Sequence, residues 1–220
     1  MFDIIQVMTI YQIYTKLKNP PNLQKHMLRV TKVGLFIYDH WTGEPINNDL
    51  LLKAALLHDV GNIVKFNIEK YPHFLGEEQK RANYWIKAQK EIIEKYGTDD
   101  HKATREMLTE LGVNPEVTQI VFDKSYPNGP KIAQSNNWIL KILLYSDLRV
   151  SPTGVISIKE RLDDLHSRLE KYKNREDLYE AGLQIEHQVQ ENMTIDVSNI
   201  TDERIARGDT QLLSTEIETN

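Results

Sequence analysis

The sequence contains no cysteine among its 220 residues. The chain therefore cannot form a disulfide bond, and it cannot hold a metal ion through thiolate ligands. Any metal ion that it binds must take imidazole and carboxylate ligands, a donor set that suits Mn, Fe, Co, Ni, Zn or Mg. The absence of cysteine leaves the cellular compartment open.

Long apolar runs and an excess of positive charge are also missing. No apolar stretch approaches the roughly 20 residues needed to cross a bilayer. The N-terminal residues lack the basic segment and the small-residue cleavage site of a secretory signal. The net charge of -5 offers no general attraction for nucleic-acid phosphates or anionic lipids. We therefore expect a cytoplasmic protein with no membrane partner and no long nucleic-acid partner.

A glycine-rich phosphate loop, a Gly-x-Ser-x-Gly nucleophile turn and internal repeats are absent as well. Apolar residues instead recur at helical spacing along most of the chain, which indicates an all-α fold. Helices are predicted over 3–17, 21–41, 47–58, 77–96, 98–111, 115–123 and 138–147, with a loop at 62–76 over the mouth of a pocket.

The composition changes near residue 151. The turn-forming sequence 151–154 separates a helical domain, residues 1–151, from two highly charged amphipathic segments at about 156–172 and 175–193. We expect these two segments to pack as a C-terminal helical hairpin within 152–193. Residues 194–220 are rich in Thr, Asp and Glu and are expected to form an acidic tail that is either draped over the protein or disordered.

Several polar side chains stand on apolar helical faces. His26 shares its face with Leu23 and Val30, and Asp147 shares its face with leucines and has no obvious cation nearby. His58 and Asp59 end the apolar run 54–57. Burying an unpaired carboxylate costs several kcal/mol or more. Taken singly, each residue has a structural alternative, a hydrogen-bonded core histidine or a capped helix end, but one divalent cation satisfies all four together.

The order His, then His-Asp about thirty residues later, then a distant Asp resembles the HD superfamily of metal-dependent phosphohydrolases. The matching surroundings are Leu23-x-x-His26-x-x-x-Val30, Ala54-Ala55-Leu56-Leu57-His58-Asp59-Val60-Gly61 and Tyr145-Ser146-Asp147-Leu148-Arg149-Val150, so the resemblance covers about residues 20–150. It implies a helical bundle in which His26, His58, Asp59 and Asp147 are metal ligands. It also implies hydrolysis of phosphate mono- or diesters, often nucleotides, with Asp59 both binding the metal and orienting the attacking water.

Three cations are candidates for binding the substrate phosphate. Arg29 lies one turn after His26, and Arg149 lies two residues after Asp147. Lys65 is a candidate for both catalysis and phosphate binding, because the Gly-Lys that commonly follows His-Asp in the family is Gly61-Asn62 here. Each of the three is alternatively a surface residue in a salt bridge.

A second metal ion is left open by the sequence. Many binuclear members of the family have two more histidines on the following helices. Here His101 falls where the first would sit, but the next helix offers Asp123 and Lys124. A second metal ion would be bound by His101 together with Asp123 or His73. If the centre binds a single metal ion, His101 would instead act as a general acid or as a hydrogen-bond donor to the substrate phosphate. An exposed loop position is the alternative for His73. The chain lacks a glutamate soon after Asp59, which argues against a nucleoside 5'-monophosphatase-type member.

The leading expectation is an enzyme in which a metal-activated water hydrolyses a phosphate mono- or diester of a small molecule, with a nucleotide as the expected substrate. The first alternative is a non-catalytic regulatory module that binds a metal or a nucleotide and uses the charged hairpin as a partner surface. The second is a di-iron oxygenase of the HD type, which requires two metal ions. The C-terminal helices are also candidates for forming a homo-oligomer.

Overall fold

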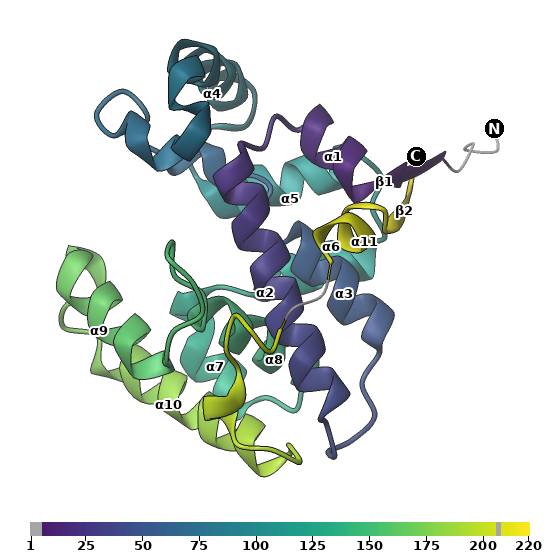
Figure 1. The fold of residues 1–220 in the computed structure, drawn as a ribbon, viewed down its shortest axis with the longest axis vertical. Coiled ribbons are helices and arrows are strands. Elements are labelled where there is room, and N and C mark those ends of the chain that lie inside the picture. The colour runs from purple at the N-terminus through teal and green to yellow at the C-terminus, as the bar shows by residue number, and fades with distance from the viewer. Residues whose placement is uncertain (1–5, 206–207) are drawn as a thin grey trace. The chain divides into compact units, whose positions relative to one another are not determined.

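The computed structural model describes residues 6–205 and 208–220, and these are mostly helical (Figure 1). The α-helices of the described residues are α1 (Ile10–Lys16), α2 (Pro21–Asp39), α3 (Asn48–Leu57), α4 (Ala82–Tyr96), α5 (Asp100–Glu110), α6 (Pro115–Asp123), α7 (Gly129–Gln134), α8 (Trp138–Leu148), α9 (Ile158–Arg168), α10 (Glu176–Glu191) and α11 (Asp209–Leu213). Short 3-10 segments are η1 (Asn62–Lys65), η2 (Pro72–Arg81), η3 (Tyr126–Asn128), η4 (Glu170–Tyr172) and η5 (Val197–Asn199). The all-α fold class is therefore confirmed.

Side-chain caps begin several of these helices. Asn47 accepts a hydrogen bond from the backbone N–H of Leu50 at 3.1 Å, and Asp99 accepts one from Lys102 at 2.8 Å. Pro21 starts α2, where its missing N–H costs nothing. None of the helices in the described ranges combines the length and the apolar character needed to cross a bilayer.

The chain forms two compact units that are not consecutive along the sequence. The first unit takes residues 1–28, 56–122 and 208–220, and the second takes 29–55 and 123–207. Helices α2 and α3 each contribute residues to both units. The boundaries expected at residues 151 and 193 follow changes in composition, which do not show which distant segments pack together.

The first unit contains the one small sheet of the described residues. Strands β1 (Gln6–Thr9) and β2 (Glu216–Thr219) pair antiparallel, with Gln6 opposite Thr219 (Figure 1). The predicted helix over 3–17 is thus wrong for Gln6–Thr9 and right for Ile10–Lys16, while residues 3–5 lie outside the described range. Thr9 and Gln12 form a capping box that fixes the helix start at Ile10.

The second unit is built around α8, whose apolar side chains are buried on nearly every side. Helix α10 packs against α7, α8 and α9. The hairpin predicted within 152–193 corresponds to α9 and α10, with the short segment η4 between them. The fully buried Leu162 and Ile185 belong to their apolar faces.

The segment after residue 193 is structured in its described parts. It contains η5, α11 and β2, and Ile200, Leu212 and Ile217 are buried. Several of the scattered Ile and Leu residues of this segment are buried in the two units. Its high content of Thr, Asp and Glu gives no sign of this burial.

Candidate metal centre

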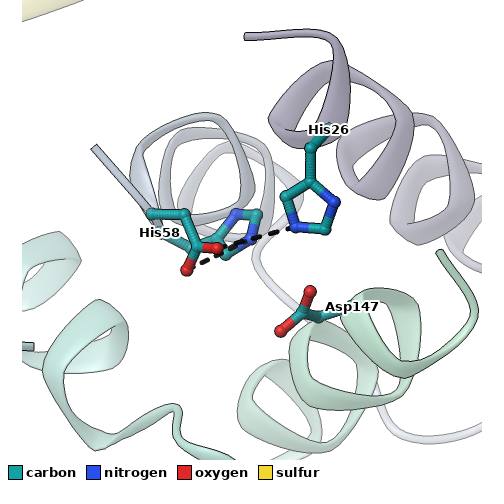
Figure 2. Close-up of side chains that lie close together, drawn as sticks. His26, His58 and Asp147 are labelled. Atoms are coloured by element: carbon teal, nitrogen blue, oxygen red, sulfur yellow. Dashed lines mark ion pairs between the residues drawn. The ribbon is translucent and has the colours of Figure 1, made fainter. Parts of the chain in front are cut away.

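Three side chains of the first unit face one another, His26, His58 and Asp59. Nε2 of His26 lies 3.6 Å from Oδ2 of Asp59, and Nε2 of His58 lies 3.6 Å from Oδ1. The two imidazole ring centroids are 5.4 Å apart, at an interplanar angle of 58°, and Figure 2 shows both rings. Each of the three residues offers a ligand atom within 4.8 Å of the others. The two imidazoles therefore flank one carboxylate, each next to a different oxygen.

Two apolar helical faces position this cluster. In α2, His26 lies on the same face as the buried Leu23 and Val30. Helix α3 ends at Leu57 after the run 54–57, whose residues are at most 1% exposed. His58 follows directly and is only 3% exposed. The helix end thus carries a buried imidazole and the adjacent carboxylate into a largely desolvated position.

The turn after Asp59 also holds that carboxylate. Asn62 is 5% exposed, and its amide Nδ2 donates a hydrogen bond to Oδ2 of Asp59. The backbone N–H of Gly61 donates to Oγ1 of Thr104 on α5 at 3.0 Å. Asn62 is a site residue whose role the sequence analysis missed. Its three-residue spacing from Asp59 within a turn was the available signal.

Asp147, the fourth predicted ligand, lies on α8 in the second unit and is labelled in Figure 2. Its Oδ2 lies 2.6 Å from Nζ of Lys124. Lys124 follows the last residue of α6 and is 4% exposed. The residues at helical spacing around Asp147 include no cation, so the sequence pattern did not predict this ion pair. Lys124 is 23 positions earlier in the chain and reaches Asp147 through tertiary packing.

Lys65 and His101 are joined through Asp100. Lys65 Nζ donates to Oδ2 of Asp100 at 2.7 Å, and about half of the Lys65 side chain is exposed. Burial raises the pKa of the Asp100 carboxyl, but the Lys65 ammonium, the hydrogen bond from it and the charge of His101 outweigh burial. The net pKa of Asp100 is below its ordinary value of 3.8, so this carboxylate is ionised at neutral pH.

The remaining predicted residues lie in different settings. Arg29 pairs with Asp202, with Nε 3.0 Å from Oδ1. His73 is an exposed residue of η2, and its ring meets the Tyr71 ring edge-on and the Phe74 ring at a tilt. Asp123 ends α6. In the parts of the chain that the structure describes, the group that could hold a metal ion includes none of His73, His101 or Asp123.

Arg149 is a structural residue, which argues against the phosphate-binding role expected for it. The residue is 4% exposed, and its guanidinium donates to the carbonyl oxygens of Ile156, Val197 and Ile200 and to the Tyr145 hydroxyl. The carbonyls belong to segments that follow α8, so Arg149 ties these segments to that helix. Although Arg149 lies only two residues after Asp147, its side chain is buried in the interior of the second unit.

We expect Arg149→Met to lower the free energy of unfolding by about 3 kcal/mol, because it leaves buried carbonyls without their donor. For a chain of this size the melting temperature should fall by roughly 6–12 °C, measured by differential scanning calorimetry. The matched control is Arg168→Met, since Arg168 is 55% exposed and pairs with Asp164 on the same helix, α9. An equal shift in both variants would contradict the assignment.

Comparison with known families agrees with this geometry. Residues 23–129 match the family profile described as HD domain. No curated protein and no solved structure matched the chain. The matched segment includes His26, His58, Asp59 and Lys124, and it ends before Asp147. The two histidines and the carboxylate that face one another occupy the positions of the motif from which the family takes its name. Residues 23–129 of this chain are therefore similar to an HD domain.

Proposed function

We propose that the protein is a metal-dependent phosphohydrolase that cleaves a phosphate mono- or diester of a small molecule, with a nucleotide as the preferred substrate class. The observation that carries this proposal is the convergence of two imidazoles on one carboxylate at the end of a buried helix. The HD-domain match supports the general reaction class. The choice of a nucleotide rests on the chemistry common in the family.

The residues present fit a divalent cation. We propose His26, His58 and Asp59 as its ligands, because these three face one another in the first unit, with Asp147 as the fourth ligand that the family resemblance implies. Two neutral imidazoles and two carboxylates form a borderline-hard donor set with a net charge of about -2, which balances one divalent ion. Four protein ligands leave coordination positions for water and for a substrate oxygen.

A bound divalent ion would supply a water of lowered pKa and would neutralise charge on the phosphoryl oxygens. The chain's own residues then have defined tasks. The Asn62 amide holds the Asp59 carboxylate in a fixed orientation, so that Asp59 can position a water for in-line attack. Arg29 remains a candidate for the substrate phosphate, because its partner Asp202 is 43% exposed and a phosphate can replace that partner.

His101 and Lys65 remain candidates for proton donation and phosphate binding. Both adjoin the ionised Asp100, and Lys65 is exposed enough to exchange this partner for a substrate oxygen. We assign no role in catalysis to His73, since its side chain lies in an exposed aromatic cluster with Tyr71 and Phe74.

Phosphate release tests the proposal. The metal-free protein is loaded in turn with Mn, Fe, Co, Ni, Zn and Mg ions and assayed against nucleoside mono-, di- and triphosphates, cyclic nucleotides and simple phosphate esters. We expect turnover of at least one substrate with at least one metal, abolished by a chelator and restored by that metal. Metal or nucleotide binding without turnover under any metal would instead favour the regulatory module.

A further inference from the structure

Lys141 is a buried lysine that has no carboxylate partner within the described part of the chain. It lies in the otherwise apolar start of α8 and is 4% exposed. Its ammonium lies 4.5 Å from the centroid of the Trp138 ring, and no ion pair or hydrogen bond joins it to a described residue. Taking an ammonium out of water is costly, and contact with an indole ring offsets only part of that cost. The surroundings of Lys141 therefore favour an anion from outside the chain.

The position of Lys141 within α8 makes its charge still less favourable. Lys141 follows Trp138, the first residue of α8, by three positions, and helical side chains lean toward the N-terminus. The ammonium therefore lies at the N-terminal end of the helix, where the backbone dipoles are already positive. Burial lowers the pKa of Lys141 from its ordinary value of 10.5, as expected when no carboxylate replaces the lost hydration. The lysine and the helix end repel each other, and both attract the same anion.

A groove beside this helix end brings two helix N-termini together. It is lined by residues 44–47, which lead into α3, and by residues 135–139, which begin α8. Both segments belong to the second unit. The volume of the groove is about 500 Å³, and small-molecule sites commonly enclose roughly 300–1,000 Å³. Trp138, whose ring the Lys141 ammonium contacts, is part of the lining, so the charge lies beside the groove.

Two asparagines of the lining cap the two helices. Oδ1 of Asn47 accepts a hydrogen bond from the backbone N–H of Leu50 at 3.1 Å. Oδ1 of Asn137 accepts one from Leu140 at 3.1 Å. Because each amide oxygen is committed to a helix, the NH2 group on its other side is a donor for a ligand. Glu44 is the carboxylate of the lining, and it is exposed and can turn to solvent. Amide and ammonium donors at helix N-termini are the groups that bind phosphoryl oxygens.

We propose that this groove is a second ligand site, which binds a phosphorylated small molecule by its phosphoryl group. Lys141 supplies the positive charge, and Asn47 and Asn137 donate hydrogen bonds from their NH2 groups. The site differs from the proposed metal centre. Asp147 lies nine positions after Trp138 on the same helix, which separates the two residues by roughly 13 Å along its axis. The inference therefore adds a site to the proposed function and does not depend on it.

Inorganic phosphate tests the inference without any measurement of turnover. The isotope-labelled chain is kept metal-free with a chelator, titrated with phosphate against chloride at the same ionic strength, and followed by NMR. We expect saturable shifts of the Trp138 indole N–H and of the side-chain amides of Asn47 and Asn137. The Trp85 indole, which donates to Glu78 in the first unit, should not shift. No saturable shift of the three groove signals, or an equal shift of the Trp85 signal, would overturn the inference.

Two variants identify the groups that bind phosphate. Lys141→Met removes the charge, and Asn137→Asp keeps the helix cap but replaces the NH2 donor by a carboxylate oxygen. Each should weaken phosphate binding at least about tenfold, as the loss of one hydrogen bond to a charged group does. Lys141→Met should also melt no lower than the wild-type protein without phosphate, since it removes an unpaired buried charge.

Lys159→Met is the matched control, because Lys159 is an exposed lysine of α9 in the same unit. It should bind phosphate with the wild-type affinity. Wild-type affinity in folded Lys141→Met or in folded Asn137→Asp would contradict the proposed site. Because the metal-free chain is used and turnover is not measured, failure of this inference leaves the proposed function standing, and the reverse also holds.

Discussion

His58→Ala should lose both metal binding and phosphohydrolase activity. The side chain of His58 is fully buried, and its Nε2 lies next to Asp59 Oδ1, so the substitution removes a proposed ligand from the centre of the cluster. Loss of the metal removes both the activated water and the charge that neutralises the phosphoryl group. We expect kcat/KM to fall by about 10³-fold or more, measured by phosphate release on the best substrate of the wild-type protein.

Thermal stability gives a second measure of the same substitution. A metal ion at about 100 times its dissociation constant stabilises the native state by about 2.7 kcal/mol. The wild-type melting temperature should therefore rise by roughly 5–10 °C on metal addition, and that of His58→Ala should not change. His187→Ala is the matched control, because the His187 side chain is 72% exposed on α10. Undiminished activity or an unchanged metal response in His58→Ala would refute the proposed centre.

Much of the fold could be predicted from local sequence patterns. Helices α2, α3 and α8 follow the spacing of their apolar residues, and Asn47 and Asp99 cap helices as their residue types indicate. Strand β1 could not be predicted in this way. Its partner β2 is about 210 residues later, so the pattern of Gln6–Thr9 contains no information about the pairing. The apolar residues that continue through this region resemble the first turn of a helix.

The residues of the candidate site likewise divide into those that local sequence patterns predict and those that only tertiary packing reveals. His26, His58 and Asp59 could be identified because each is a polar residue on an apolar face, which is a local property. The partners that hold the carboxylates, Asn62 and Lys124, were harder to predict from the sequence. Lys124 reaches Asp147 across the interior of the second unit. An ion pair of this kind depends on tertiary packing, and so the helical spacing around either residue does not reveal it.

At position 61 of the turn after Asp59, the chain has no room for a side chain. A Cβ at this position would lie 2.7 Å from Thr104 Oγ1 and 2.9 Å from the carbonyl carbon of Ala103, and closer still to the Thr104 nitrogen. Two of these atoms belong to the backbone of α5, which a side-chain rotation cannot move. The glycine therefore allows the turn after His58 and Asp59 to approach α5 closely. The hydrogen bond from Gly61 N–H to Thr104 Oγ1 depends on that approach.

Gly61→Ala should therefore damage both stability and function. Separating the turn from α5 should lower the free energy of unfolding by about 1–3 kcal/mol, as overpacking does in other cores, measured by urea denaturation. It should also displace Asp59 and Asn62, and a shift of about 1 Å in a reacting group can reduce the rate roughly 10²-fold. We thus expect kcat to fall by about that factor.

Gly34→Ala separates this clash from the general effect of adding a methyl group. Gly34 is also buried, but it lies within α2, and a Cβ there would meet Ser146 Oγ at 3.4 Å, an ordinary van der Waals contact. Alanine also favours the helix by up to about 1 kcal/mol over glycine. Gly34→Ala should therefore be at least as stable as the wild-type protein and retain its activity. If Gly61→Ala behaves in the same way, the close approach to α5 does not fix the position of Asp59.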